Sequence, residues 1–102
     1  MKAIITFTMQ EAVSHMARPY NEKLVENRLR NLCKENCVKP YLDTYGRGQG
    51  REFTERNLDE LDIALSMVEL NLPYRLIKRL MVEYRQTGSA TIQNKNVTIL
   101  VG

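Results

Sequence analysis

The chain has 102 residues, 43% hydrophobic and 26% charged, which is the composition of one ordinary globular domain. Its formal net charge is +3, and the excess lies before Leu58: ten basic and seven acidic residues precede it, and five of each follow from there. No run approaches the roughly 18 apolar residues of a membrane span, MKAIITF is too short and polar for a secretion signal, and two cysteines are too few for a disulfide framework. We therefore expect a protein of a reducing, bacterial or phage-like cytoplasm, whose basic first half suits a polyanionic partner.

Lys2 to Phe7 is rich in β-branched and aromatic residues and predicts a short strand. Thr8 and Glu11 then have the spacing of a capping box, in which each side chain bonds the backbone at the other's position. The capping box predicts a first helix over about 9–17. Its apolar residues fall on one helical face: Met9, Ala12, Val13 and Met16.

Pro19 interrupts this helix, and Asn21 is a suitable N-cap for a second helix over about 22–36. The buried stripe of the second helix is expected at Val25, Leu29 and Leu32. The opposite face carries side chains of the kinds that reach base edges and phosphates, namely Lys23, Asn27, Arg30, Asn31 and Lys34. Two helices joined by such a break predict a helix-turn-helix unit. The alternative is a solvated face, because Glu22, Glu26 and Glu35 share this surface.

The segment from Thr44 to Leu61 opens with Gly46, Gly48 and Gly50, which predict a loop tip. Two short strands, about 38–45 and 51–53, would flank this loop, and Pro40 confines the first to a sheet edge. A glycine loop that carries Arg47 and Arg51 just before a helix is typical of the wing of a winged helix-turn-helix domain, here over 45–53. An ordinary hairpin loop with solvated arginines is the alternative.

A third helix is predicted from Thr54 to about Leu70, and a fourth from about Tyr74 to Tyr84, ended by Gly88. Each has one apolar stripe: Leu58, Leu61, Leu65 and Val68 on the third, and Leu76, Ile77, Leu80, Met81 and Tyr84 on the fourth. The carboxylates of the third helix are attributed to the helix dipole and to solvent rather than to catalysis: Asp59, Glu60 and Asp62. The basic residues of the fourth helix are attributed to a solvated face near the helix C-terminus, with contact to a phosphate backbone as the alternative: Arg75, Lys78, Arg79 and Arg85.

Residues 90–93 and 96–101 predict a terminal β-hairpin, whose second strand alternates as Val97, Ile99 and Val101. A half-buried strand has this alternation. The hairpin would pair with the N-terminal strand or offer an edge to a second subunit.

Five segments carry a resemblance in their order along the chain: FTMQEAVSHM, NEKLVENRLRNLCKEN, VKP, GREFTERNLDEL and MVELNLPYRLIKRLM. Together they resemble the DNA-binding domain of MerR-like regulators, which are the mercury-resistance regulator family and its excisionase-like relatives. The resemblance covers about residues 7–81, with the hairpin 89–102 outside it. It implies a recognition helix in the major groove and a wing on the phosphate backbone. The residues that it places toward the groove are Lys23, Asn27 and Arg30, and those toward phosphate are Arg47, Arg51 and Arg56.

Two departures from the family bear on function. The break ARPYN is longer and stiffer than the family's tight turn, which predicts a different setting of the recognition helix. A short hairpin replaces the long dimerisation helix of the family. We therefore do not expect this chain to sense an effector or to activate transcription by promoter distortion, as the family does.

The sequence thus predicts an α+β fold, mainly helical, with four helices, a wing hairpin and a terminal hairpin, in a single winged helix-turn-helix domain. The predicted function is sequence-specific binding of double-stranded DNA, as a small transcriptional regulator or an excisionase-like accessory factor, and homodimerisation would let it read two half-sites. The alternative is a protein-interaction module on the same fold. We expect no enzymatic activity, cofactor or small-molecule effector. We also expect no metal site, because Cys33, Cys37 and the single histidine, His15, are too few ligands for structural zinc.

Overall fold

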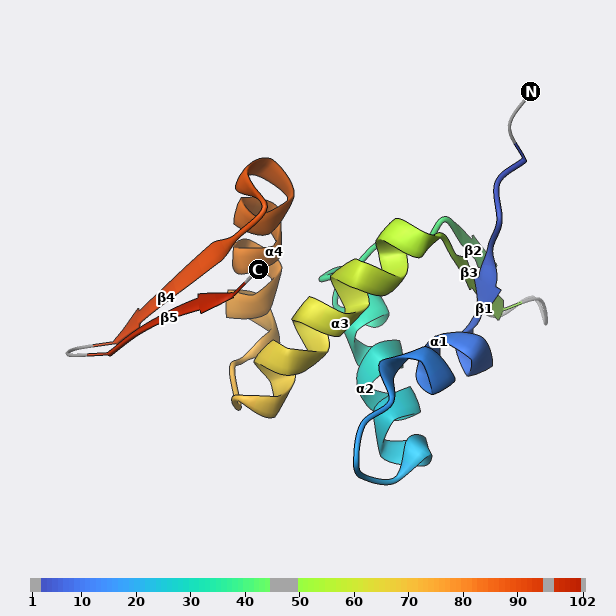
Figure 1. The fold of residues 1–102 in the computed structure, drawn as a ribbon, viewed down its shortest axis with the longest axis horizontal. Helices are drawn as coiled ribbons and strands as arrows, with labels where there is room; N and C mark the ends of the chain where they lie inside the picture. Colours follow the sequence, from blue (N-terminus) through green and yellow to red (C-terminus); the bar gives the residue numbers. More distant parts are fainter. Residues whose placement is uncertain (1–2, 45–49, 95–96, 102) are drawn as a thin grey trace.

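A computed structural model describes residues 3–44, 50–94 and 97–101 of the chain. Over these residues the fold is mainly helical, as predicted, with two small antiparallel sheets (Figure 1). The elements in chain order are β1 (Phe7–Thr8), α1 (Met9–Met16), α2 (Glu22–Lys34), β2 (Leu42–Thr44), β3 (Gly50–Phe53), α3 (Glu55–Glu69), α4 (Tyr74–Thr87), β4 (Ala90–Asn94) and β5 (Val97–Val101). None of the helices in the described part of the chain is long and apolar enough to cross a membrane.

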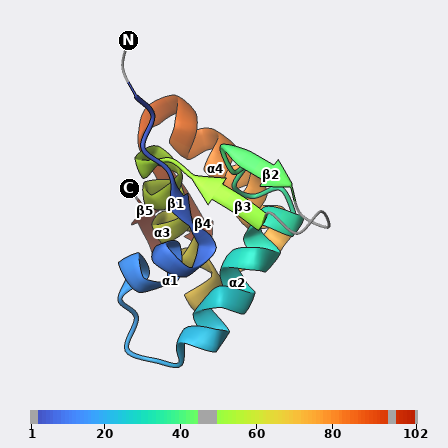
Figure 2. The same cartoon turned by 90° about the vertical axis from the view of Figure 1, so that its right-hand side faces the viewer.

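The first sheet has the strand order β1-β3-β2, with both pairs antiparallel. Phe7 lies opposite Phe53, and Phe53 is completely buried, so this sheet closes one end of the core (Figure 2). The predicted strand over 2–7 is wrong for residues 3–6, and residue 2 lies outside the described residues. Beyond Phe53 the chain turns into α3, which leaves Ile4 and Ile5 opposite no residue of β3, and these residues are 60% and 73% exposed.

The core is formed where α1, α2 and α3 meet the first sheet, and α4 extends it from the other side of α3 (Figures 1 and 2). The predicted stripes are confirmed for their central residues, all buried: Ala12, Val13, Met16, Val25, Leu29, Leu32, Leu58, Leu61, Leu65, Ile77, Leu80 and Met81. The predicted stripe residues at the margins are half-buried and pack against this core: Met9, Val68, Leu76 and Tyr84.

Both predicted N-caps of the first two helices are present, and the capping box of Thr8 and Glu11 is complete. The second helix, however, ends at Lys34 instead of Asn36. Asn36 adopts a left-handed φ of 61°, and the amides of Asn36 and Cys37 donate to the carbonyls of Cys33 and Leu32. This hydrogen-bond pair is a Schellman motif, which satisfies the last carbonyls and turns the chain toward β2.

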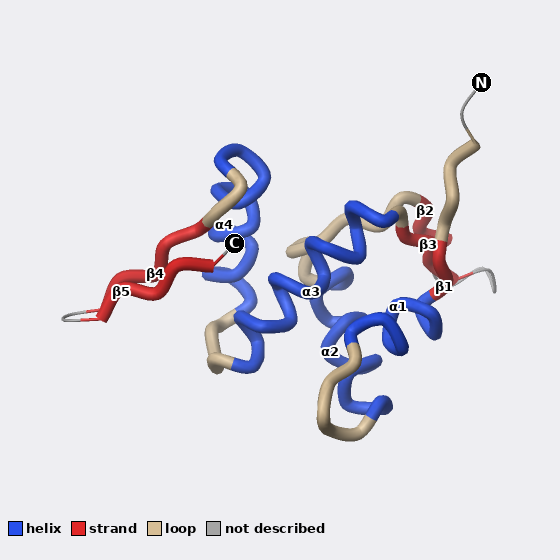
Figure 3. The backbone as a smooth tube through the Cα atoms, viewed as in Figure 1, coloured by secondary structure: helices blue, strands red, loops and turns tan. Residues whose placement is uncertain are grey.

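Gly88, with φ 82°, ends α4 three residues after the predicted end at Tyr84. The chain then forms the hairpin of β4 and β5, which extends away from the three-helix body (Figures 1 and 3). The alternative in which this hairpin pairs with the N-terminal strand is wrong, because β1 pairs with β3. The predicted half-burial of Val97, Ile99 and Val101 lies outside the described side chains.

Candidate nucleic-acid interface

The exposed face of α2 carries the five polar residues predicted for DNA contact. Asn21 caps the helix by accepting from the Lys23 amide at 2.7 Å, and burial of Val25 and Leu29 fixes the helix rotation against the core. Asn27, Arg30, Asn31 and Lys34 occur at positions i, i+3, i+4 and i+7, and all four side chains are exposed. That spacing places them along one side of the helix.

These four residues line one surface hollow of about 490 Å³, and Arg51 from β3 lines it from the sheet side. The structure therefore brings together five of the eight predicted site residues. The described residues that line the hollow are three cations and two amides, without a carboxylate. Cations attract phosphate, and Asn and Arg can read base edges by paired hydrogen bonds.

Arg51 lies differently from the other members of this group. It faces Asp43 directly across β2 and β3, its Nε is 3.5 Å from the Asp43 carboxylate, and its side chain is 9% exposed. A guanidinium that is largely buried and ion-paired cannot contact DNA as an exposed lysine side chain can. Arg51 therefore forms the sheet-side wall of the hollow, where it adds positive potential.

Glu26 lies beside the hollow and pairs with Arg30, at 3.2 Å between its carboxylate and Nη2. Both side chains are partly exposed, at 31% and 49% respectively. An exposed pair one helical turn apart is worth only about 0.3–0.5 kcal/mol. Arg30 can therefore leave Glu26 for a stronger anion at little cost.

The remaining predicted site residues are not in this hollow. Lys23 is exposed one turn before Asn27, on the N-terminal turn of α2. Arg56 lies in the first turn of α3 with a 76% exposed side chain, and it lines a separate hollow with Asp59 and Tyr84. Arg47 lies outside the described residues.

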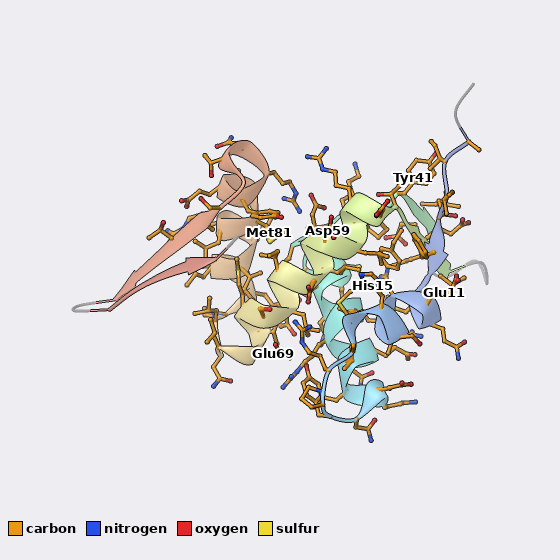
Figure 4. The ribbon with its side chains drawn as sticks, viewed as in Figure 1. Glu11, His15, Tyr41, Asp59, Glu69 and Met81 are labelled. Atoms are coloured by element: carbon orange, nitrogen blue, oxygen red, sulfur yellow. The ribbon has the colours of Figure 1, made fainter. Side chains whose placement is uncertain are left out.

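The connection between α1 and α2 is held by Arg18, which the sequence did not single out. Its guanidinium is 2.7 Å from the Asp62 carboxylate and 2.9 Å from that of Glu69, both on α3. Figure 4 shows Glu69 at the C-terminal end of α3, and the Tyr20 hydroxyl donates to it at 2.5 Å. Burial and this hydrogen bond raise the pKa of Tyr20.

The Tyr20 ring in turn lies under the guanidinium of Arg28, at 5.1 Å from its centroid. A cation over a tyrosine face is attracted by the ring quadrupole. The long break ARPYN is therefore fixed to α3 on one side and to α2 on the other. This double contact sets the angle of α2 in the described structure.

Asn57 holds the segment that leads into β2. Its side chain completes a capping box with Thr54, and its Oδ1 also accepts from the Tyr41 amide at 3.0 Å, while its Nδ2 donates to the Lys39 carbonyl. Tyr41 lies at the small sheet, at the opposite end of α3 from Glu69 (Figure 4). The spacing of Thr54 and Asn57 is that of a capping box and could be recognised in the sequence. The hydrogen bonds of Asn57 to Lys39 and Tyr41 depend on the tertiary structure.

The prediction that Glu60 is solvated is wrong. It is only 6% exposed, and its carboxylate accepts from Arg85 Nε at 3.0 Å. Arg85 also donates to the Cys37 carbonyl at 2.6 Å, so it too is not the solvated surface residue that was predicted. These contacts join α3 and α4 to the chain that leaves α2.

Both cysteines are free and buried, and Cys37 lies beyond the end of α2. Burial raises the pKa of Cys33 to about 11 and also raises that of Cys37. Protonated thiols are poor nucleophiles and metal ligands. Within the described residues, no group of three or more histidine, cysteine or carboxylate side chains is placed to hold a metal ion.

Comparison of the chain with protein-family models, curated proteins and solved structures finds no match. The function is therefore inferred from the geometry of α2 and its surroundings.

Proposed function

We propose that this chain binds double-stranded DNA as a winged helix-turn-helix protein, with α2 in the major groove. The observation that carries the proposal is the hollow lined by Asn27, Arg30, Asn31, Lys34 and Arg51. Four of these residues combine cations with amides on the exposed face of α2, and the described lining contains no carboxylate. Arginine, lysine and asparagine are side chains that pair with base edges in the major groove.

The roles of the residues follow from their exposure and chemistry. Arg30, Asn27 and Asn31 are assigned to base edges, because arginine pairs with guanine and asparagine with adenine through two hydrogen bonds. Lys34 and Lys23 are assigned to phosphates, together with Arg47 in the connection between β2 and β3 that would act as a wing. Arg51 is assigned to supporting potential, since Asp43 occupies part of its hydrogen-bonding capacity.

A small transcriptional regulator and an excisionase-like accessory factor would both use such an interface. The second candidate function is a protein-interaction module, which is favoured by the glutamate beside Arg30 and by exposed apolar side chains near the sheet. Tyr41 and Leu42 are 55% and 40% exposed. An acidic protein surface would engage the cations of α2, but it would not show the salt dependence of a regular phosphate array.

The test is the affinity for a fluorescently labelled duplex, measured by anisotropy at salt concentrations between about 50 and 200 mM. Three or four phosphate contacts predict a plot of log K against log salt with a slope of about −3. We also expect duplex DNA to bind more tightly than heparin, which offers the charge without the groove. A flat salt response, or equal affinity for duplex and heparin, would rule out the DNA function.

A further inference from the structure

The hairpin of β4 and β5 is a two-stranded sheet of its own. Its register pairs Ala90 with Val101, Ile92 with Ile99 and Asn94 with Val97, and neither strand pairs with any other described strand. It extends from the end of α4 away from the core of α1, α2 and α3 (Figure 1). An isolated two-stranded hairpin is marginally stable in water, and it is stabilised by further strands or by packing against a helix.

The strand β5 has none of the features that protect natural sheet edges from pairing. Such edges usually carry lysine, proline, a bulge or an inward charge. β5 has the sequence VTILV, in which no residue is charged and four of the five are β-branched. The hairpin's lysine, Lys95, stands between the strands and not within either of them.

The two strands differ in how they meet the rest of the chain. β4 packs against α4, and Ala90, its first residue, is completely buried. Among the described strands, β5 pairs with β4 alone. The edge of β5 that faces away from β4 is therefore the better candidate for pairing with another strand.

We propose that two copies of this chain associate through β5, by antiparallel pairing around a two-fold axis at Ile99. The product is one four-stranded sheet with the order β4-β5-β5-β4. In this register Val97 lies opposite Val101 of the second copy, and Thr98 lies opposite Leu100 of the second copy. This antiparallel register pairs all five residues of β5 with residues of the second copy. Shifting the register by one residue leaves one residue of each β5 strand unpaired.

The sequence of β5 suits this arrangement. A two-fold interface brings the same surface of both subunits together, so the strand must be complementary to itself. Directly opposed side chains on one face of an antiparallel pair lie close enough to pack against each other. Opposed like charges would prevent the association, and β5 has no charged residue. The association does not require DNA.

The test compares two double variants that alter the same positions, by sedimentation equilibrium of the full chain without DNA from about 1 to 100 µM. Thr98→Lys with Leu100→Lys places like charges opposite each other across the axis, and we expect a monomer. Thr98→Lys with Leu100→Glu places opposite charges there, and we expect the dimer of the wild type. A monomeric wild type, a chain of open-ended oligomers, or equal masses for the two variants would overturn the proposal.

A second measurement does not depend on how well the lysine variant folds. Under mild oxidation, Ile99→Cys should form a covalent dimer, because directly opposed residues of an antiparallel pair have a Cα separation compatible with a disulfide. Gln93→Cys, on β4, is the matched control and should remain monomeric. A covalent dimer from both variants, or from Gln93→Cys alone, would contradict pairing through β5. DNA affinity is measured separately, so failure of either proposal is distinguishable from failure of the other.

Discussion

Arg85→Met should lower the free energy of unfolding by about 3–5 kcal/mol, the cost of leaving a buried carboxylate without its partner. Arg85 supplies the shortest ion pair to Glu60, at 3.0 Å, and the next cation, Arg56, is 3.9 Å away with a 76% exposed side chain. The variant also removes the donor to the Cys37 carbonyl. Urea unfolding followed by circular dichroism measures the loss.

A double variant separates the charge effect from lost packing. Adding Glu60→Leu to Arg85→Met removes the unpaired carboxylate and should recover most of the lost stability, as is often found when a buried ion pair is replaced by apolar residues. Arg79→Met is the control for an exposed arginine of the same helix, and it should change stability by less than about 0.5 kcal/mol. If Arg85→Met were as stable as Arg79→Met, the assigned role of the Glu60 pair would be wrong.

Arg30→Ala combined with Lys34→Ala should weaken duplex binding by about 100-fold, because each lost contact to a base or phosphate costs on the order of 1–3 kcal/mol. Both side chains are exposed in the same hollow, and within the described part of the chain the ion pair that is lost is the partly exposed one between Arg30 and Glu26. The fold should therefore be retained. Anisotropy with the labelled duplex measures the loss, and circular dichroism checks the fold.

The matched control is Arg75→Ala combined with Lys78→Ala on α4, which removes the same charge from another exposed surface. Charges far from the DNA are screened at physiological salt, so we expect a change of less than about threefold. Equal losses for the two double variants would mean that net charge, and not the α2 face, determines binding.

The sequence predicted those features that depend on local patterns. The apolar stripes of the four helices, the capping box of Thr8 and Glu11, and the stop at Gly88 could all be recognised because their signals lie within a few residues. The grouping of Asn27, Arg30, Asn31 and Lys34 was predictable for the same reason. Helical spacing alone places them on one face.

The errors involve contacts between residues far apart in the chain. Glu60 and Arg85 look like surface charges within their own helices, and only the packing of α4 on α3 brings them together. The paired state of Arg51 likewise depends on its register with Asp43. Ile4 and Ile5 have strand-forming side chains but no strand opposite them, which no local pattern could indicate.

The most direct test of the DNA-binding proposal is an NMR titration of the ¹⁵N-labelled chain with a duplex of about 20 base pairs. We predict that the largest amide shifts occur on α2, at Asn27, Asn31 and Lys34, and that the outer face of α4 at Arg75 and Arg79 changes little. Shifts centred on α4, or the absence of shifts on α2 at saturating DNA, would contradict the assignment of α2 as the helix that enters the major groove.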